Sequence, residues 1–95
     1  MNIEIKHPVL LDAQQRHREY PRTFSVPDKM VLQTLSRGDY AQVCADRERF
    51  WVLITEVVKT GFQGVIENDL ICTSAHHLAD GDRIFFEAQN ILKTQ

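Results

Sequence analysis

The sequence lacks any apolar run that approaches the roughly 18 residues needed to span a bilayer. Its first residues, Met1 to Lys6, also lack the basic start and long apolar stretch of a secretory signal peptide. Cysteine is scarce: Cys44 and Cys72 lie in different apolar-flanked segments, which is typical of buried, reduced thiols rather than of a disulfide framework. We therefore expect a cytoplasmic protein that does not insert into a membrane.

The motifs of several enzyme classes are missing. The chain contains no glycine-rich phosphate loop, no Gly-x-Ser-x-Gly, no Cys-x-x-Cys and no His-x-x-x-His. The most site-like cluster is His76 and His77 with Asp80 and Asp82. A closed zinc site needs four converging ligands, however, and adjacent histidines on a strand point to opposite faces. We expect no metal, no cofactor and no enzymatic activity. A metal-dependent or thiol enzyme, with Cys72 beside these histidines, is the least favoured alternative.

An excess of basic charge is also absent. Eleven basic residues stand against thirteen acidic ones, which gives a formal net charge of −2 at pH 7. Domains that bind duplex nucleic acid usually carry a basic surface, so this balance argues against such binding.

The length and the apolar content indicate one small domain. With 95 residues, 43% of them hydrophobic, the chain can bury a core without disulfides or metals. We expect residues 25–95 to form this domain and residues 1–24 to form an N-terminal extension. Within the extension, Asp12 can cap a surface helix that ends before Pro21.

Beyond residue 24 the pattern changes from helix to strand. Ser25 or Asp28 can cap an amphipathic helix that Gly38 closes, with an apolar stripe from Met30 to Leu35. Alternating apolar residues then predict strands over residues 40–45, 49–59, 62–68, 70–73 and 83–87.

Glycine predicts local geometry at three positions. Gly64 lies within the expected strand 62–68 and indicates a bend or bulge there. Residues 35–39 and 78–82 share the pattern Leu-x-x-Gly-Asp, each just before a strand. Glycine in such a turn can supply a positive φ, and aspartate can supply a side-chain hydrogen bond.

Both faces of the expected strand 49–59 are apolar over its middle. In an antiparallel setting this implies a sheet that curls on itself or is covered by helices. We predict an α+β fold, a strongly bent antiparallel sheet or small, partly open β-barrel with one packed N-terminal helix. Trp51, Phe62 and Phe86 are expected in its core, with Phe85 on the opposite face from Phe86.

The candidate binding residues are basic or imidazole side chains near turns. They are Arg16, Arg18 and Arg22 near the N-terminus, Arg47 and Arg49 at a charged turn, and His76 and His77 in the last long loop. For the first group the simpler interpretation is a solvated helix face whose basic end suits the helix dipole.

Five short patterns also occur together between Thr23 and Leu92. They are Thr23-Phe24 with Pro27, Leu35-x-x-Gly38-Asp39, Glu48-Arg49-Phe50-Trp51-Val52, Phe62-x-Gly64-x-x-x-Asn68 and Leu78-x-x-Gly81-Asp82-x-Ile84-x-Phe86. In this combination the chain resembles the YegJ-like domains, a bacterial family of unknown function. The resemblance implies a compact, mostly β module with an N-terminal helix, and it brings no catalytic residues.

These observations together predict a small non-enzymatic bacterial module whose partner is another protein, in an accessory or regulatory role. Nucleic-acid binding through a barrel face that carries Arg47, Arg49 and Arg83 is the alternative, because aromatic residues lie beside these arginines on the expected strands. Association of the chain with itself stays open.

Overall fold

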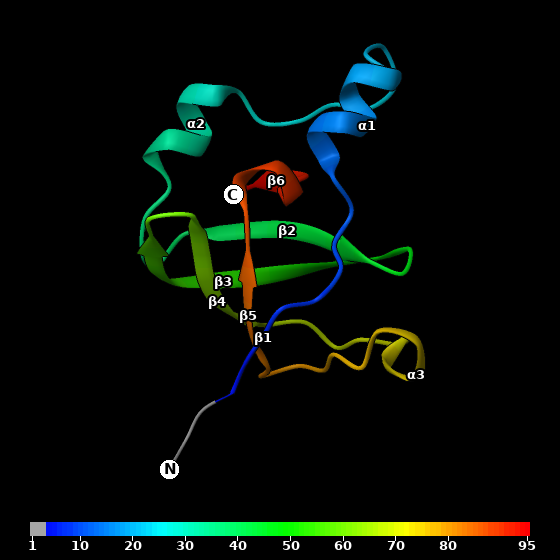
Figure 1. The fold of residues 1–95 in the computed structure, drawn as a ribbon, viewed down its shortest axis with the longest axis vertical. Helices are drawn as coiled ribbons and strands as arrows, with labels where there is room; N and C mark the ends of the chain where they lie inside the picture. The colour runs from blue at the N-terminus through cyan, green and yellow to red at the C-terminus, as the bar shows by residue number, and fades with distance from the viewer. Residues whose placement is uncertain (1–3) are drawn as a thin grey trace.

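Alternating apolar residues form the strands of a strongly bent, six-stranded sheet that does not close on itself (Figure 1). The computed structural model describes residues 4–95. The strands are β1 (Ile5–Lys6), β2 (Tyr40–Ala45), β3 (Glu48–Val58), β4 (Gly61–Ile66), β5 (Arg83–Phe86) and β6 (Lys93–Thr94), in the order β1-β5-β4-β3-β2-β6.

The predicted α+β fold with a bent sheet is confirmed, but the sheet is mixed rather than wholly antiparallel. β1 runs parallel to β5, with Ile5 opposite Arg83 and Lys6 opposite Ile84. Since the long stretch of chain between β1 and β5 imposes no hairpin geometry, the parallel direction is open to this pair.

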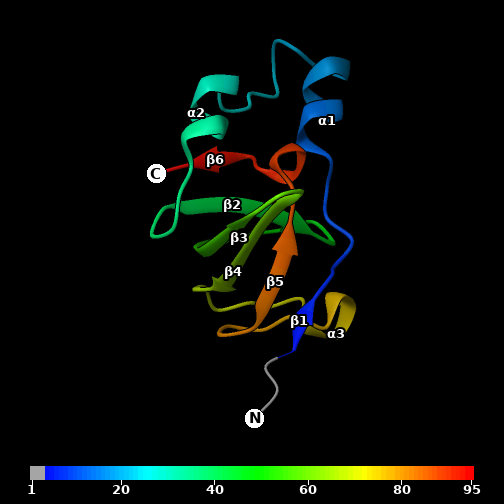
Figure 2. The same cartoon turned by 60° about the vertical axis from the view of Figure 1, so that its left-hand side comes forward.

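The helices are short and lie at the two ends of the sheet. They are α1 (Ala13–Glu19), α2 (Lys29–Thr34) and α3 (Thr73–His76), with a 3₁₀ turn, η1, at Ala88–Asn90. Figures 1 and 2 place α1 and α2 at the end beyond β6, and α3 towards the other end. No helix within residues 4–95 is long and apolar enough to cross a membrane.

The predicted helices form, with differences in their detail. For α2 the predicted caps are wrong: Asp28 is at the N-cap position but makes no side-chain hydrogen bond there, and the helix ends at Thr34, before the turn that contains Gly38. Asp12 caps α1 as expected, because its carboxylate accepts a hydrogen bond from the Gln15 N–H at 3.0 Å. The apolar stripe predicted for α2 is partly wrong: Met30 is 76% exposed, whereas Leu32 and Leu35 pack against the core. A helix of six residues contacts the core along one narrow edge, so the neighbouring apolar side chains stay in solvent.

The core lies on one face of β3. Phe50, Val52 and Ile54 are fully buried there, while Trp51 on the other face is only half-buried. The prediction that Trp51 belongs to the core is therefore wrong: the core packs on the face that carries Phe50, and alternation then puts Trp51 on the other face. Phe62 and Phe86 are buried as predicted and stack with ring centroids 5.4 Å apart.

The bulge predicted near Gly64 lies on the facing strand. The register of β3 against β4 shifts between Ile54 and Glu56, with Ile54 opposite Gly64. A Cβ at Gly64 would lie 2.5 Å from Val52 Cγ1 and 2.6 Å from the Leu53 carbonyl oxygen. Glycine thus permits the close crossing, and β3 carries the extra residue that bends the sheet.

The two Leu-x-x-Gly-Asp turns have the same structure, as predicted. Gly38 and Gly81 have φ values of +98° and +89°. Asp39 accepts a hydrogen bond from the Ser36 N–H at 2.9 Å, and Asp82 accepts one from the Ala79 N–H at 3.0 Å. The first turn exchanges backbone hydrogen bonds with Ile54 on β3 and the second does so with Ile66 on β4.

The N-terminal segment crosses from one edge of the sheet to the other; we call residues 5–11 the N-terminal strap. It pairs with β5 through β1, and the Leu11 N–H then donates to the Cys44 carbonyl on β2 at 2.9 Å. Asn90 Nδ2 donates to the Leu11 carbonyl at 3.2 Å, and Ala13 beyond the strap is fully buried. The strap is therefore fastened at both of its ends.

Candidate functional site

A cleft of about 560 Å³ opens beside the N-terminal strap. Its walls are the strap, α1, the turn between β2 and β3, and α3. Leu10, Leu11, Phe24 and Cys44 give the cleft an apolar lining. Open, largely apolar hollows of this size that also hold a few polar groups are the usual form of a binding site.

Three arginines from separate segments converge on this cleft: Arg16 from α1, Arg47 from the β2–β3 turn and Arg49 from β3. All three residues are exposed. In the part of the chain that the structure describes, the basic side chains within 4 Å of a carboxylate are Lys6, beside Asp82, and His76, beside Glu48, so these guanidinium groups have no carboxylate partner. The cleft therefore combines apolar walls with positive charge that is free to meet an anion.

The electrostatics at Cys44 report the same clustering of charge. Burial raises the pKa of this thiol, while Arg49, the Arg47 N–H and Arg16 all act to lower it. The charges of Arg49 and Arg16 thus both act on the sulfur atom of Cys44, near the C-terminal end of β2.

The turn that presents Arg47 has an uncommon backbone. Ala45 pairs with Glu48, which leaves Asp46 and Arg47 as a two-residue loop. Their φ values are +46° and +69°, as a type I′ turn requires at both central positions. The charged turn predicted beside Arg47 thus consists of Asp46 and Arg47 alone, and β3 begins at Glu48, one residue before the predicted strand 49–59.

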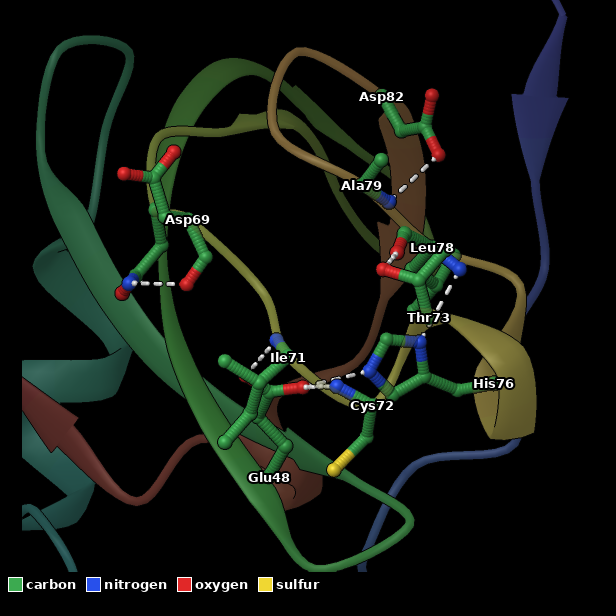
Figure 3. A network of polar contacts seen from close by, with 10 residues as sticks. Glu48, Asp69, Ile71, Cys72, Thr73, His76, Leu78, Ala79 and Asp82 are labelled. Atoms are coloured by element: carbon green, nitrogen blue, oxygen red, sulfur yellow. Dashed lines mark hydrogen bonds and ion pairs between the residues drawn. The ribbon is translucent and has the colours of Figure 1, made fainter.

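Glu48 binds the segment before and within α3 (Figure 3). Its carboxylate accepts hydrogen bonds from the N–H groups of Ile71 and Cys72, both at 2.8 Å. His76 Nε2 lies 2.9 Å from the same carboxylate, and the Leu78 N–H donates to His76 Nδ1 at 3.1 Å. Because Leu78 can only donate to an unprotonated Nδ1, this pattern places the ring hydrogen on Nε2. The pKa of Glu48 is lowered to about 2, first by the Ile71 N–H and then by His76.

This network explains why the strand predicted over residues 70–73 is wrong. A side chain takes up the N–H groups of Ile71 and Cys72, which a sheet ladder would otherwise use. The segment becomes a loop that leads into α3, and the network holds Ala75 and His76 as one wall of the cleft.

The surroundings of Cys72 do not favour its thiolate form. The pKa of the Cys72 thiol is raised, first by burial and then by the Glu48 carboxylate, whereas a nucleophilic cysteine needs a lowered one. His76 directs its two nitrogens to Glu48 and to the Leu78 N–H rather than to sulfur. Across residues 4–95 no three His, Cys, Asp or Glu side chains gather as metal ligands would.

The structure brings together four of the seven predicted binding residues. Arg16, Arg47, Arg49 and His76 line the cleft, whereas Arg18, Arg22 and His77 do not. His77 is exposed with a φ of +59°, and its carbonyl accepts a hydrogen bond from Lys6 Nζ.

Arg83 lies elsewhere, in a second hollow of about 550 Å³ that it shares with Arg37 and Glu56. Arg47 and Arg83 are thus on different hollows. Sequence reasoning missed the strap as a wall of the cleft. The one signal for it is the extended conformation that Pro8 imposes on its neighbour His7.

Comparisons with models of protein families, with curated proteins and with solved structures find no match for this chain.

Proposed function

We propose that the protein is a non-enzymatic interaction module that binds another protein through the cleft beside the N-terminal strap. The observation that carries the proposal is the convergence of Arg16, Arg47 and Arg49, without carboxylate partners among residues 4–95, on a largely apolar cleft. Arginine is enriched at protein interfaces because its planar fork binds carboxylates in pairs of hydrogen bonds. Apolar walls strengthen such bonds once a partner excludes water.

The setting proposed for this activity is a bacterial cytoplasm. Cys44 and Cys72 are both free thiols, which a reducing compartment would preserve. Kinship with the YegJ-like domains is part of the same proposal and supplies no partner by itself.

The test is affinity capture from a bacterial lysate, with and without nuclease, by three tagged forms of the protein. The first is the unchanged chain and the second carries Arg16→Glu, Arg47→Glu and Arg49→Glu. The third is a matched control with Arg18→Glu, Arg22→Glu and Arg37→Glu, which reverses as many exposed charges outside the cleft.

We expect a discrete protein that survives nuclease, binds the unchanged chain and the control, and is lost from the cleft variant. Equal capture by all three forms would contradict the proposal, and so would capture that disappears with nuclease. Thermal unfolding of each variant shows whether a loss of capture reflects the surface or the fold.

A second candidate function is single-stranded nucleic-acid binding on the outer face of the sheet. Leu53 pairs with Val65 and Val65 with Arg83, so alternation puts Arg83 on the same face as half-buried Trp51. Stacking on aromatic rings beside basic residues is how such platforms work. The test is binding of an oligothymidylate, followed by quenching of Trp51 fluorescence. Binding that weakens steeply between about 50 and 200 mM salt would favour this function. Absence of quenching at low salt would reject it.

A further inference from the structure

The strap carries an unpaired stretch of backbone along the cleft. Between the β1 pairing and the Leu11–Cys44 hydrogen bond, the main-chain groups of Val9 and Leu10 make no hydrogen bond to any part of residues 4–95. The side chain of Val9 is 94% exposed. Figures 1 and 2 show this stretch as an extended ribbon that rises from β1 to α1.

An extended backbone with free N–H and C=O groups is what an added strand requires. Native proteins usually cover such edges, and recognition domains use them to bind a partner's extended segment. The stretch is held at its two ends, by the pairing of β1 with β5 before it and by the hydrogen bond of Leu11 to Cys44 after it. Neither contact uses the hydrogen-bonding groups of Val9 and Leu10. The ordering cost on binding is correspondingly small.

The charge of the cleft selects the chemistry of that segment. Arg16, Arg47 and Arg49 line the same cleft as the strap, and Asp46 is the one carboxylate among its lining residues. The apolar positions Leu10, Leu11 and Phe24 offer contact to aliphatic side chains. Phe24 is also the only phenylalanine, tyrosine or tryptophan in the lining, so the cleft lacks the set of aromatic rings on which bases stack.

We propose that the cleft binds an extended, acidic segment of the partner protein, which adds as a strand along Val9 and Leu10. Its carboxylates pair with Arg16, Arg47 and Arg49, and its apolar side chains rest against Leu10, Leu11 and Phe24. This inference rests on the proposed function and names the chemistry of its partner.

The experiment is selection of binders from a displayed library of random dodecapeptides, followed by measurement of their affinities. We expect the selected peptides to be acidic with interspersed aliphatic residues. Their affinity should fall at least tenfold in the variant with Arg16→Glu, Arg47→Glu and Arg49→Glu. It should hold in the control with Arg18→Glu, Arg22→Glu and Arg37→Glu.

Strand addition has a readout of its own at the backbone. Because the N–H groups of consecutive residues in an extended chain point to opposite sides, an added strand pairs with either Val9 or Leu10. Amide hydrogen exchange, followed by NMR, should therefore slow at least tenfold at one of these two residues when the selected peptide binds. If the slowed amide is that of Val9, Val9→Pro removes this N–H while keeping the stretch extended, and it should weaken the peptide at least tenfold. If the slowed amide is that of Leu10, Leu10→Pro is the corresponding variant. Val9→Thr keeps the N–H and the β-branched shape, so it should bind within about twofold of the unchanged chain.

The outcomes of this experiment distinguish a failure of strand addition from a failure of the proposed protein-binding function. A library that yields no acidic binder, or binders that leave exchange at Val9 and Leu10 unchanged, overturns strand addition. In that case, the arginine variant can still fail to capture a protein that the unchanged chain captures from the lysate. The protein-binding function would then be supported, and its partner would bind through a folded surface. Competition of the selected peptide by oligonucleotide or inorganic phosphate at equal concentration would overturn the acidic-peptide assignment in favour of a phosphate ligand.

Discussion

At the scale of single residues, the β2–β3 turn holds two of the three residues other than glycine that lie at positive φ among residues 4–95. Asp46 and Arg47 both lie at positive φ, where a side chain costs on the order of 1 kcal/mol relative to glycine. Arg47 also lines the cleft. The hairpin turn thus places a charged residue at the cleft at a cost in backbone strain.

Arg47→Gly should therefore stabilise the fold and weaken partner binding at the same time. Glycine relieves the strain at φ +69°, so we expect the free energy of unfolding in urea to rise by about 1 kcal/mol. Asp46→Gly is the comparison variant: it relieves φ +46°, leaves the arginines in place and removes the one carboxylate of the cleft lining, so it should not weaken binding of an acidic partner. Weaker binding in both variants would show that turn geometry, rather than charge, recognises the partner.

The Glu48 carboxylate should make stability depend on acid pH. Its folded-state pKa of about 2 lies below its usual value of 4.5. Its contacts therefore stabilise the fold in full when the pH is above about 4.5. This contribution is lost as the pH falls from about 4.5 towards 2. Urea unfolding between pH 7 and pH 2 should show a steeper loss for the unchanged chain than for Glu48→Gln. Glu56→Gln, at an exposed position, should keep the full slope; equal slopes in all three would contradict the assignment.

At the scale of elements, the two Gly-Asp turns act as fasteners. Each turn holds the chain before a strand against a neighbouring strand, at Ile54 within β3 or at Ile66 at the end of β4. The side-chain hydrogen bonds of Asp39 and Asp82 close these turns from within.

Asp39→Ala should lower the free energy of unfolding by about 1 kcal/mol through loss of its hydrogen bond to Ser36. Asp82→Ala should cost more, because Asp82 also pairs with Lys6 at 2.9 Å. Chemical denaturation of both single variants and the double variant measures this, and the two losses should add because the sites share no partner. A smaller loss at Asp82 than at Asp39 would contradict it.

The two faces of β3 should differ in their response to truncation. Phe50→Ala empties a fully buried site and should cost about 3–5 kcal/mol. Trp51→Ala should cost clearly less, since that side chain is only half-buried. Circular dichroism during urea unfolding compares the two without relying on tryptophan. A larger loss of unfolding free energy from Trp51→Ala than from Phe50→Ala would show that Trp51 belongs to the core.

At the scale of the whole molecule, the N-terminal strap covers the β5 edge and forms one wall of the cleft. Removal of residues 1–11 should lower the free energy of unfolding and promote self-association through the opened β5 edge. Light scattering and urea unfolding at several protein concentrations measure both effects. A truncated chain that stays monomeric and as stable as the full chain would show that the strap is dispensable for the sheet.

Strand content was largely predictable because period-two alternation is local, and the Gly-Asp turns were predictable because their chemistry lies within five residues. The burial of Phe50 instead of Trp51 was not, because both faces of β3 are apolar and only tertiary packing chooses between them. The loop before α3 depends on Glu48, which lies 23 residues before Ile71 in sequence. The cleft depends on the strap, whose partners lie on β2 and β5. Contacts of such separation leave no periodic signal in a single sequence.

The strap also sets the order in which the chain can finish folding during synthesis. It leaves the ribosome before its partners, Cys44 first and then Arg83 and Ile84. The hairpins β2–β3 and β3–β4 are complete by Ile66, so they can form while the strap is still unpaired on its β5 side. A nascent chain paused before Arg83 would therefore expose the free edges of both β1 and β4, and it is at that length that it would most need a chaperone.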